Sequence, residues 1–512
     1  MEEHKEHTLG RRYLSKLAAQ FISLIITFIM QAIVPRSLGP KNYGSYSFLQ
    51  DYFNKIISFF DVGTSTAFFT KLSQRKNEFS IISFYFRLLT LVFSLVIGFA
   101  VGVSVFSLEH YFFPDQEWLF ILMAAFVVCI FFLSEIFFKI TDAYGLTVFS
   151  EKIRVFSRLL SVILVIVLFA LHRLNLLSFY ITLIVQYGLL TIALVLLLGR
   201  NSKSIFRENW SLSLHSFKSY FMEFFSYSKP LLLLSLIGTL AGILERLILQ
   251  KFSGSSAQGF YGLSYAIGQI CFLFTSSMTP LFMREISISF ANNRLDEIKA
   301  SFSRLAPLLF LISSYFACFI AVNSQFVVVL LGGKNFSDAA FSLTIMAFYP
   351  IHQTYGQLTA SVFFATNDTK KYSVIGLVFI GLGLALTYFT IAPHVSGGLD
   401  MGSAGLSIKM VAIQFFAVNV SLFFIAKKYR LGFLRLLGHQ AFCIVYFTAS
   451  AYLIKLFCSN VFENNIIVFF FGGLAYTTIS ILLLYFFPAM FGLSLADRNS
   501  LKSKISNMIK RQ

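Results

Sequence analysis

Charged residues are scarce in this sequence. Only 12% of its 512 residues are Asp, Glu, Lys or Arg, whereas a soluble globular domain usually contains about 25%. Hydrophobic residues make up 57% of the chain, which is more apolar surface than a single water-facing globule can cover. This composition excludes an ordinary soluble protein and indicates that most of the chain is solvated by lipid.

Cysteine pairs and long polar segments are also missing. The five cysteines lie in or beside apolar runs and none forms a CxxC pair, so we expect neither a disulfide framework nor a metal site. No GxxxxGK[ST] phosphate loop occurs, so an ATP-driven pump would need a separate partner. The longest polar interval, residues 200–229, has room for an amphipathic surface helix but not for a catalytic domain.

A separate basic arm is absent, although the net charge is +18. Lys and Arg occur instead in short clusters between apolar runs, which is the pattern of membrane topology and not of nucleic-acid binding. With the N-terminus in the cytoplasm, only a few bases fall outside, namely Arg36, Lys41, Arg173, Lys251 and Lys334. This asymmetry predicts that both termini are cytoplasmic.

Apolar runs of membrane-spanning length recur along the whole chain. About twenty apolar residues cross a bilayer as a helix, and segments such as LLSVILVIVLFAL do not alternate as strands of a barrel would. We predict an all-α integral membrane protein with about fourteen transmembrane helices. The approximate spans are 17–35, 44–69, 80–107, 117–138, 156–172, 177–199, 230–250, 257–283, 305–331, 340–365, 373–392, 403–425, 439–458 and 466–488. The first run lacks a convincing cleavage site, so we expect it to stay as a helix.

Two polar stretches between apolar runs resemble each other. Residues 36–46 read RSLGPKNYGSY, and residues 251–261 read KFSGSSAQGFY. Four positions correspond at one interval of 215 residues: Arg36, Gly39, Gly44 and Tyr46 match Lys251, Gly254, Gly259 and Tyr261. The equivalent placement predicts an internal duplication, with each stretch forming a hairpin between the first two helices of a half.

Ionisable residues inside the spans are the strongest candidates for function, because each costs about 2.5–3.5 kcal/mol at a helix centre. Asp51 and Lys55 are four residues apart and can pair on one helix face. This pair is either a neutral structural bridge or part of a site. His352, on a span that Pro350 interrupts, is either a satisfied core residue or a site residue. The candidate cavity cations are Lys55, Arg87, Arg246 and Lys409, and the candidate ion-coupling groups are Asp61, Glu245, Asp51 and His352.

Several of these stretches resemble one transporter family. RSLGPKNYGSYSF followed by DVGTSTAFFTKLSQ is similar to the N-terminal signature of the Wzx-type polysaccharide flippases, which belong to a superfamily with multidrug exporters of the MATE type. TPLFMREISISFANNRLDEIKASFSR resembles an inner loop of the same family. The resemblance implies a MATE-like arrangement of tail 1–16, N-lobe 17–199, linker 200–229, C-lobe 230–425, two helices in 439–488 and basic tail 489–512.

The resemblance also implies a function. Such flippases move undecaprenyl-diphosphate-linked oligosaccharide from the cytoplasmic to the periplasmic leaflet of the bacterial inner membrane, for O-antigen or capsule synthesis. They work by alternating access through a cationic cavity. The resemblance implies no enzyme activity and no cofactor, with H⁺ or Na⁺ as candidate coupling ions and Glu245 as the counterpart of an exporter acid. A polymerase and a chain-length regulator of the same pathway are candidate partners, and the two hairpins are a candidate outer gate.

Three other functions are alternatives. A MATE-like multidrug or cation antiporter would favour an acid-dominated cavity, and the bases in these spans count against it. A membrane glycan polymerase or acyltransferase would usually need a sizeable outer loop, and the predicted outer loops are short. A scaffold would not need the buried charges.

Overall fold

The computed structural model describes residues 9–61, 63–75, 78–201 and 214–486. The chain forms two compact units. The first unit comprises residues 1–262 and 331–335, and the second comprises 263–330 and 336–512. The expected tails 1–16 and 489–512 and the middle of the linker 200–229 lie wholly or partly outside the described residues. The two six-helix lobes, 17–199 and 230–425, remain a prediction from the family resemblance.

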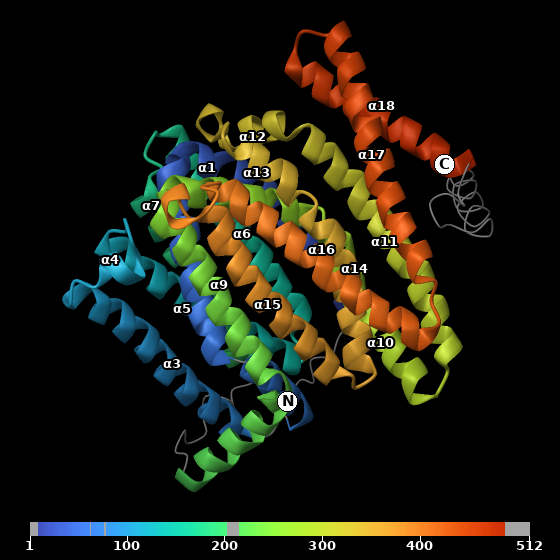
Figure 1. Cartoon of the computed structure of the whole chain (residues 1–512). Coiled ribbons are helices and arrows are strands. Elements are labelled where there is room, and N and C mark those ends of the chain that lie inside the picture. The colour runs from blue at the N-terminus through green and yellow to red at the C-terminus, as the bar shows by residue number, and fades with distance from the viewer. Residues whose placement is uncertain (1–8, 62, 76–77, 202–213, 487–512) are drawn as a thin grey trace. The chain divides into compact units, whose positions relative to one another are not determined.

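The described residues form helices and no strand (Figure 1). The first unit contains α1 (Leu9–Asp61), α2 (Thr64–Gln74), α3 (Phe79–Val105), α4 (Glu109–Phe112), α5 (Trp118–Ala143), α6 (Thr147–Ala170), α7 (Leu176–Asn201) and most of α9 (Leu214–Ile270). The second contains α10 (Leu273–Ala291), α11 (Leu295–Val322), α13 (Ala339–Met346), α14 (Tyr349–Ala365), α15 (Thr369–Ile391), η2 (His394–Ser396), α16 (Gly402–Tyr429), α17 (Phe433–Val461) and α18 (Asn465–Phe486). The boundary between the units falls within α12 (Ser324–Gly332) and η1 (Lys334–Phe336).

Ten of the described helices are long and apolar enough to cross a membrane. They are α3, α5, α6, α7, α9, α11, α15, α16, α17 and α18. Four predicted spans have no separate helix in this set: the two legs of α1, the α13–α14 segment, and span 257–283, which shares α9 with span 230–250. The sequence predicts spans 44–69, 257–283, 305–331 and 340–365 as continuous helices. This is wrong, because the chain breaks between α1 and α2, between α9 and α10, between α11 and α12, and between α13 and α14. The prediction of an all-helical membrane protein is confirmed.

Helices α1 and α9 each contain one non-helical residue, and it is the first glycine of the repeat in both. Gly39 has φ 72° and ψ 170°, and Gly254 has φ 74° and ψ −176°. A side chain is strongly disfavoured in this region of backbone space, so glycine is required at the two points. The same strained geometry at corresponding positions supports the internal duplication.

The chain reverses direction at each of these glycines. Tyr43 donates a hydrogen bond to Gln31 Oε1 at 3.2 Å, and Arg246 donates one to Gln258 Oε1 at 2.7 Å. The partners are twelve residues apart in both cases, which would place them about 18 Å apart in a straight helix. The two predicted hairpins are therefore present.

The segment 214–229 at the start of α9 packs on α3 through one face and pairs with α2 through another. Phe224 is buried, with its ring centre 5.1 Å from that of Phe84. Glu223 Oε1 pairs with Lys71 Nζ at 2.7 Å and with Arg75 Nη2 at 2.9 Å. The described part of the linker is therefore the amphipathic helix that its composition allows.

The Glu223 ion pairs should weaken at low pH. The hydrogen bond from Lys71 and the charge of Arg75 hold the pKa of the Glu223 carboxyl below its usual range. A carboxyl whose pKa falls on folding adds stability above its unfolded pKa, about 4.3, and this stability is lost as pH falls through the lowered value. We expect hydrogen-exchange protection of 214–229 to fall below about pH 4 in the wild type. Glu223→Gln should show weaker protection at neutral pH and no such step; unchanged protection in this variant would contradict the assignment.

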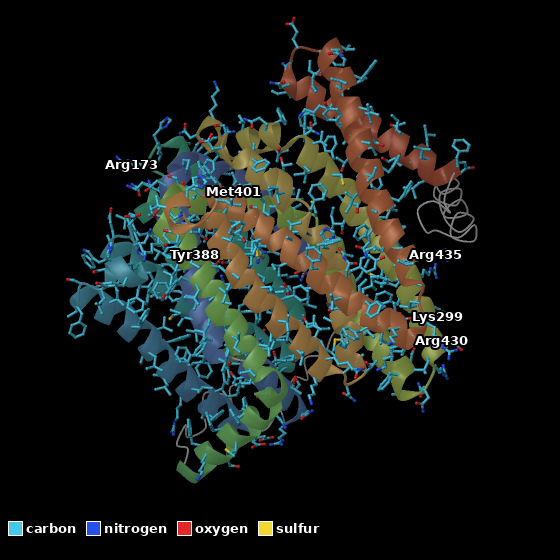
Figure 2. The ribbon with its side chains drawn as sticks, viewed as in Figure 1. Arg173, Lys299, Tyr388, Met401, Arg430 and Arg435 are labelled. Atoms are coloured by element: carbon cyan, nitrogen blue, oxygen red, sulfur yellow. The ribbon has the colours of Figure 1, made fainter. Side chains whose placement is uncertain are left out.

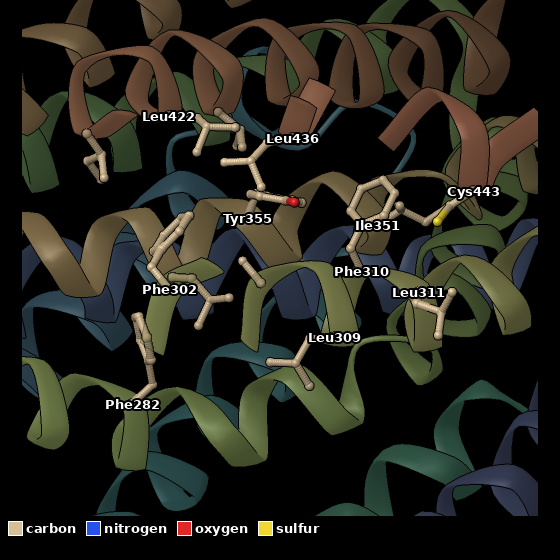
Figure 3. Close-up of a cluster of buried hydrophobic side chains, with 14 of the residues drawn as sticks. Phe282, Phe302, Leu309, Phe310, Leu311, Ile351, Tyr355, Leu422, Leu436 and Cys443 are labelled. Atoms are coloured by element: carbon tan, nitrogen blue, oxygen red, sulfur yellow. The ribbon is translucent and has the colours of Figure 1, made fainter. Parts of the chain in front are cut away.

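The second unit is held together by a large apolar cluster. Phe302, Phe310, Tyr355 and Cys443 belong to it, and they come from α11, α14 and α17 (Figure 3). Phe310 and Tyr355 pack edge to face with ring centres 5.3 Å apart. This packing fixes α14, the helix that begins just after the break at residues 347–348 and carries Pro350 in its first turn.

Basic residues gather at one end of the second unit. Figure 2 shows Lys299, Arg430 and Arg435 at that end, close to the α16–α17 turn. Ile298, Leu431 and Leu436 beside them belong to one buried cluster, so the three basic side chains come from segments that pack together. The arrangement agrees with the charge asymmetry that predicts one membrane face for these residues.

Candidate functional site

Two cations share one carboxylate oxygen in the first unit. Lys55 Nζ on α1 donates to Asp51 Oδ2 at 2.6 Å. Arg246 Nε on α9 donates to the same oxygen at 3.0 Å. Lys55 Nζ also donates to the carbonyl oxygen of Gly242 at 2.9 Å. The predicted pair of Asp51 and Lys55 is present, and Arg246 completes what we call the Asp51 cluster (Asp51, Lys55 and Arg246).

Arg246 is buried and has the most contacts in the Asp51 cluster. Besides Asp51, its Nη1 donates to Gln258 Oε1, and Gln258 Nε2 donates to the Arg246 carbonyl oxygen, both at 2.7 Å. Its guanidinium carbon lies 4.5 Å from the centre of the Tyr261 ring, within cation–π range. Arg246 is 7% exposed, whereas the side chains of Asp51 and Lys55 are 33% and 28% exposed. The cluster thus has a buried cation and a partly open carboxylate.

The hydrogen bond across each reversal follows the repeat. Gln31 and Tyr43 precede Arg246 and Gln258 by the same 215 residues that separate Gly39 from Gly254. In both copies the earlier side chain bonds the one twelve residues later. The first copy joins a neutral amide to a phenol, and the second joins a guanidinium to an amide. Corresponding positions of the two copies therefore make the same tertiary contact, but only the second copy carries a charge there.

The segments that follow the two reversals cross at very short distance. A Cβ added at Gly44 would lie 1.7 Å from the Ser255 carbonyl oxygen, and one added at Gly259 would lie 2.2 Å from the Pro40 carbonyl oxygen. Real side chains do not approach backbone atoms so closely, so only glycine fits at either position. Pro40 and Ser255 correspond in the repeat as Gly44 and Gly259 do. This glycine crossing (Gly44, Gly259 and their contacts) is therefore pseudo-symmetric, and small residues permit the close approach.

Ser255, which takes the place of Pro40 in the second copy, joins a group of amides beside the crossing. Its Oγ accepts hydrogen bonds from Gln250 Nε2 at 2.9 Å and from Gln116 Nε2 at 3.0 Å. Gln250 Nε2 also donates to the Pro114 carbonyl oxygen at 2.9 Å. These bonds join the second reversal to the turn that precedes α5.

The buried glutamines were missed by the sequence reasoning. Gln250 and Gln258 are fully buried, but they carry no charge, so a search for ionisable residues in apolar spans passes over them. The repeat contained a usable signal, because it aligns Gln258 with Tyr43 and Arg246 with Gln31. Extending the comparison beyond the glycines would have pointed to both pairs.

Asp61 stands apart from the Asp51 cluster and caps α2. Its Oδ1 accepts hydrogen bonds from Thr64 Oγ1 and the Ser65 backbone N–H, and its Oδ2 accepts one from Ser65 Oγ, each at 2.8 Å. A carboxylate at this position satisfies the free N–H groups of a helix start. Its contacts favour a structural role, and ion coupling at Asp61 stays a prediction.

The other predicted site residues of the first unit are spread over several elements. Arg87 on α3 is exposed and lies outside the Asp51 cluster. Glu245 is half-buried and close enough to act electrostatically on Lys55. Arg36 and Lys251 are both exposed, three residues before the glycines of their reversals. Of the four predicted cavity cations, the structure therefore brings Lys55 and Arg246 together.

His352 and Lys409 belong to the second unit and are both buried. The His352 ring on α14 packs against the Phe415 ring at 5.1 Å, and its Nδ1 has no hydrogen-bond partner among the described residues. Lys409 on α16 fills space beside α15, because a Cβ at Gly383 would lie 2.9 Å from Lys409 Cε. Each is a polar group in an apolar setting, as the sequence predicts, and their functional roles stay predictions.

A metal site is not found within the described ranges, where no three His, Cys, Asp or Glu side chains lie close enough to hold an ion. His439 Nε2 lies 3.5 Å from Cys443 Sγ, but no third ligand joins this pair among the described residues. A structural zinc needs four ligands and a catalytic one three. The chemistry available is therefore that of charges, amides and hydroxyls.

The region with both reversals and the Asp51 cluster also carries a family match. Residues 9–283, more than half of the chain, match the family described as polysaccharide biosynthesis protein. The chain belongs to this family. Comparison with curated proteins gives no significant match.

Solved transporter structures have the same fold as this member of the polysaccharide biosynthesis family. The lipid II flippase MurJ, in an inward closed conformation, matches with a TM-score of 0.67 at 12% identity, over 92% of this chain and 99% of MurJ. An inward-facing MATE multidrug resistance transporter of the MOP superfamily matches with a TM-score of 0.60 at 12% identity, over 80% of this chain and 94% of its own. A MOP superfamily transporter from Pyrococcus furiosus, with reversed polarity of its binding pocket, matches with a TM-score of 0.55 at 13% identity. The match covers 82% of this chain and 95% of that transporter. These proteins are transporters and not enzymes, and at such identities the likeness is one of fold.

Proposed function

We propose that this protein is a flippase for undecaprenyl-diphosphate-linked oligosaccharide in the synthesis of a surface polysaccharide such as O-antigen or capsule. The observation that carries the proposal is the Asp51 cluster, in which Lys55 and Arg246 both bind one carboxylate oxygen. The cluster lies in the segment that matches the polysaccharide biosynthesis family. The proposed location is the bacterial inner membrane, with both termini in the cytoplasm.

The proposed chemistry is a competition between two anions for the same cations. A diphosphate offers several charged oxygens where Asp51 offers two, and phosphate oxygens bind Arg and Lys strongly. The Asp51 and Lys55 side chains are about one-third exposed, so an incoming head group has access to them. Release on the other side is assisted because Asp51 then pairs again with both cations. Arg87 and Lys409 are further candidate contacts.

The proposed outer gate is the glycine crossing. Its helices separate when the cavity opens outward, and they close again to reset the carrier. Arg36 and Lys251 lie near the rim of this gate, and Tyr46 and Tyr261 lie on the helices that follow. Moving negative charge out of an inside-negative cell is favourable by about 2.3 kcal/mol per charge per 100 mV. A coupling ion, H⁺ or Na⁺, then mainly serves the return step, for which Glu245 and His352 are candidates besides Asp51 and Asp61.

Reconstitution tests this proposal most directly. Purified protein in vesicles should move lipid-linked oligosaccharide between leaflets, which a membrane-impermeant glycan-cleaving enzyme added outside can follow. In the host, deletion of the gene should trap repeat units on the inner leaflet and remove surface glycan. Single units accumulating on the outer leaflet would point to a polymerase, and unchanged pools with lost drug resistance would point to a multidrug antiporter.

A matched pair of variants connects transport with the Asp51 cluster. Lys55→Met combined with Arg246→Gln should reduce flux by about tenfold or more, since charge-assisted hydrogen bonds contribute about 1.5–3 kcal/mol each. Lys152→Gln combined with Lys299→Gln also removes two positive charges, but from exposed positions, and should leave at least half of the flux. Equal flux in both double variants would overturn the assignment of the cations.

A further inference from the structure

A second polar site lies in the first unit, apart from the Asp51 cluster. A cavity of about 270 Å³ is lined by the first leg of α1, the start of its second leg, α6 and α7. Arg158, Ser161 and Gln186 line it, together with the tyrosines Tyr46 and Tyr187. No member of the Asp51 cluster lines it. A polar cavity of this size among apolar helices is normally filled by a ligand or by water.

Arg158 supplies the only charge in the lining of this cavity. Among the described residues it forms no ion pair within 4 Å, although Glu135 and Glu151 are near enough to act on it electrostatically. Both carboxylates bind Arg154 instead, at 3.5 Å and 3.8 Å. A guanidinium inside an apolar bundle is costly, so Arg158 is positioned to accept an anionic partner from within the cavity.

The other polar groups of the cavity also have unused hydrogen-bonding capacity. Ser161 is 2% exposed, and its Oγ has no partner among the described residues. The side-chain amide of Gln186, which is 8% exposed, and the hydroxyls of Tyr46 and Tyr187 likewise form no hydrogen bond within the described part of the chain. Ser161 and Gln186 are buried, whereas Tyr46 and Tyr187 are half-buried. Buried polar groups are normally satisfied, so the Ser161 hydroxyl and the Gln186 amide, next to two tyrosine hydroxyls, indicate a polar ligand.

The size and shape of the lining restrict that ligand. At about 30 Å³ per water the cavity corresponds to about nine waters, so chloride or a single phosphate would leave most of it empty. The rings of Tyr46 and Phe179 stand edge to face at 5.0 Å and give the cavity an apolar wall. A fitting ligand therefore carries one anionic group, several hydroxyls and an apolar face. A six-carbon sugar acid has these features and is of this size.

We propose that the cavity between α1, α6 and α7 binds a sugar acid, with its carboxylate on Arg158 and its hydroxyls on Ser161, Gln186 and the two tyrosines. A carboxylate matches the planar guanidinium in a bidentate pair. The sugar acid is either a unit of the transported glycan, which rests on the proposed function, or a free metabolite. Binding by the purified protein is independent of transport, so the two proposals can fail separately.

The test is calorimetric binding to the purified full-length protein, with glucuronate as the probe and glucose, acetate and inorganic phosphate as comparisons. We expect glucuronate to bind at least about tenfold more tightly than each comparison, since each lacks either the carboxylate or the hydroxyls. Arg158→Gln should weaken glucuronate binding about tenfold or more, and Arg158→Lys should be intermediate because lysine cannot form the bidentate pair. Tyr187→Phe should weaken it by a smaller factor.

Lys152→Gln is the matched control, because it removes one positive charge from the same helix at an exposed position. It should leave glucuronate binding unchanged. If glucuronate does not bind, if phosphate or acetate binds as well, or if Arg158→Gln has no effect in a protein with normal circular dichroism, the proposal is overturned. If glucuronate binds but reconstituted vesicles move no lipid-linked glycan, the sugar-acid site stands and the proposed function fails. If Arg158→Gln also slows transport of lipid-linked glycans containing sugar acids, but not of neutral ones, the transported glycan is the source of the ligand.

Discussion

Adding a single methyl group at Gly44 is expected to reduce transport about tenfold or more, because overpacking a close helix contact costs about 1–3 kcal/mol. In Gly44→Ala the new Cβ would lie 1.7 Å from the Ser255 carbonyl oxygen, and in Gly259→Ala 2.2 Å from that of Pro40. Both obstacles are backbone atoms, so no rotation of a side chain relieves them, and the helices must separate. The two variants should therefore have similar defects, since the repeat relates the two contacts.

Gly98→Ala is the control for these variants. It adds the same methyl group to an apolar helix, but nothing lies within 4 Å of the added atom. Transport should remain at wild-type level, and helix stability should rise slightly. A defect in Gly98→Ala as large as in Gly44→Ala would show that the effect is not specific to the glycine crossing.

A cysteine pair measures the state of the crossing independently of transport. Ser45 Oγ and Ser255 Oγ are 3.4 Å apart and buried, so Ser45→Cys combined with Ser255→Cys should form a disulfide on mild oxidation. Gly44→Ala in this background should lower the cross-linking yield. If the crossing is the outer gate, the disulfide should stop transport and a reductant should restore it. Full transport by the cross-linked protein would contradict the gate.

Removing the charge of Asp51 is expected to be the most destabilising single change in the Asp51 cluster. Asp51→Asn leaves Lys55 and Arg246 beside each other without the carboxylate oxygen that both bind. Breaking a fully buried ion pair costs about 3–5 kcal/mol. Since Asp51 is one-third exposed, solvent screens part of the repulsion, and we expect a loss of about 1–3 kcal/mol in the free energy of unfolding.

The repulsion can be separated from the lost hydrogen bonds by a double-mutant cycle. Lys55→Met in the Asp51→Asn background removes one of the two cations, so it should recover part of the lost stability, although Lys55→Met alone is destabilising. Thermal unfolding of the purified variants gives both values. Asp296→Asn, which removes a carboxylate from an exposed position, should change stability little. If the changes in the free energy of unfolding caused by Asp51→Asn and by Lys55→Met simply add in the double variant, the sharing of the Asp51 carboxylate is contradicted.

The fold class follows from the sequence because membrane spans are local features. A run of apolar residues long enough to cross the bilayer must form a helix wherever it lies, since its backbone groups have no water to bind. The reversals at Gly39 and Gly254 could be predicted because each glycine lies in a polar stretch between two apolar runs. The pairing of Asp51 with Lys55 could be predicted because residues i and i+4 lie on one face of a helix. The breaks near residues 62, 272 and 347 could not be predicted from the sequence, because the hydrophobicity of those segments continues across them.

The composition of the candidate sites was decided by tertiary structure. Arg246 reaches Asp51 across 195 residues of sequence, and nothing local distinguishes it from exposed Arg87 or from Arg158, which lines a separate cavity. Asp61 was as good a candidate as Asp51 until the start of α2 was found to use its oxygens. The sequence by itself determined how many charges lie among the apolar helices and on which segments. Which of them meet depends on helix packing between distant segments, because the energy of a charge in the membrane is set by its partners.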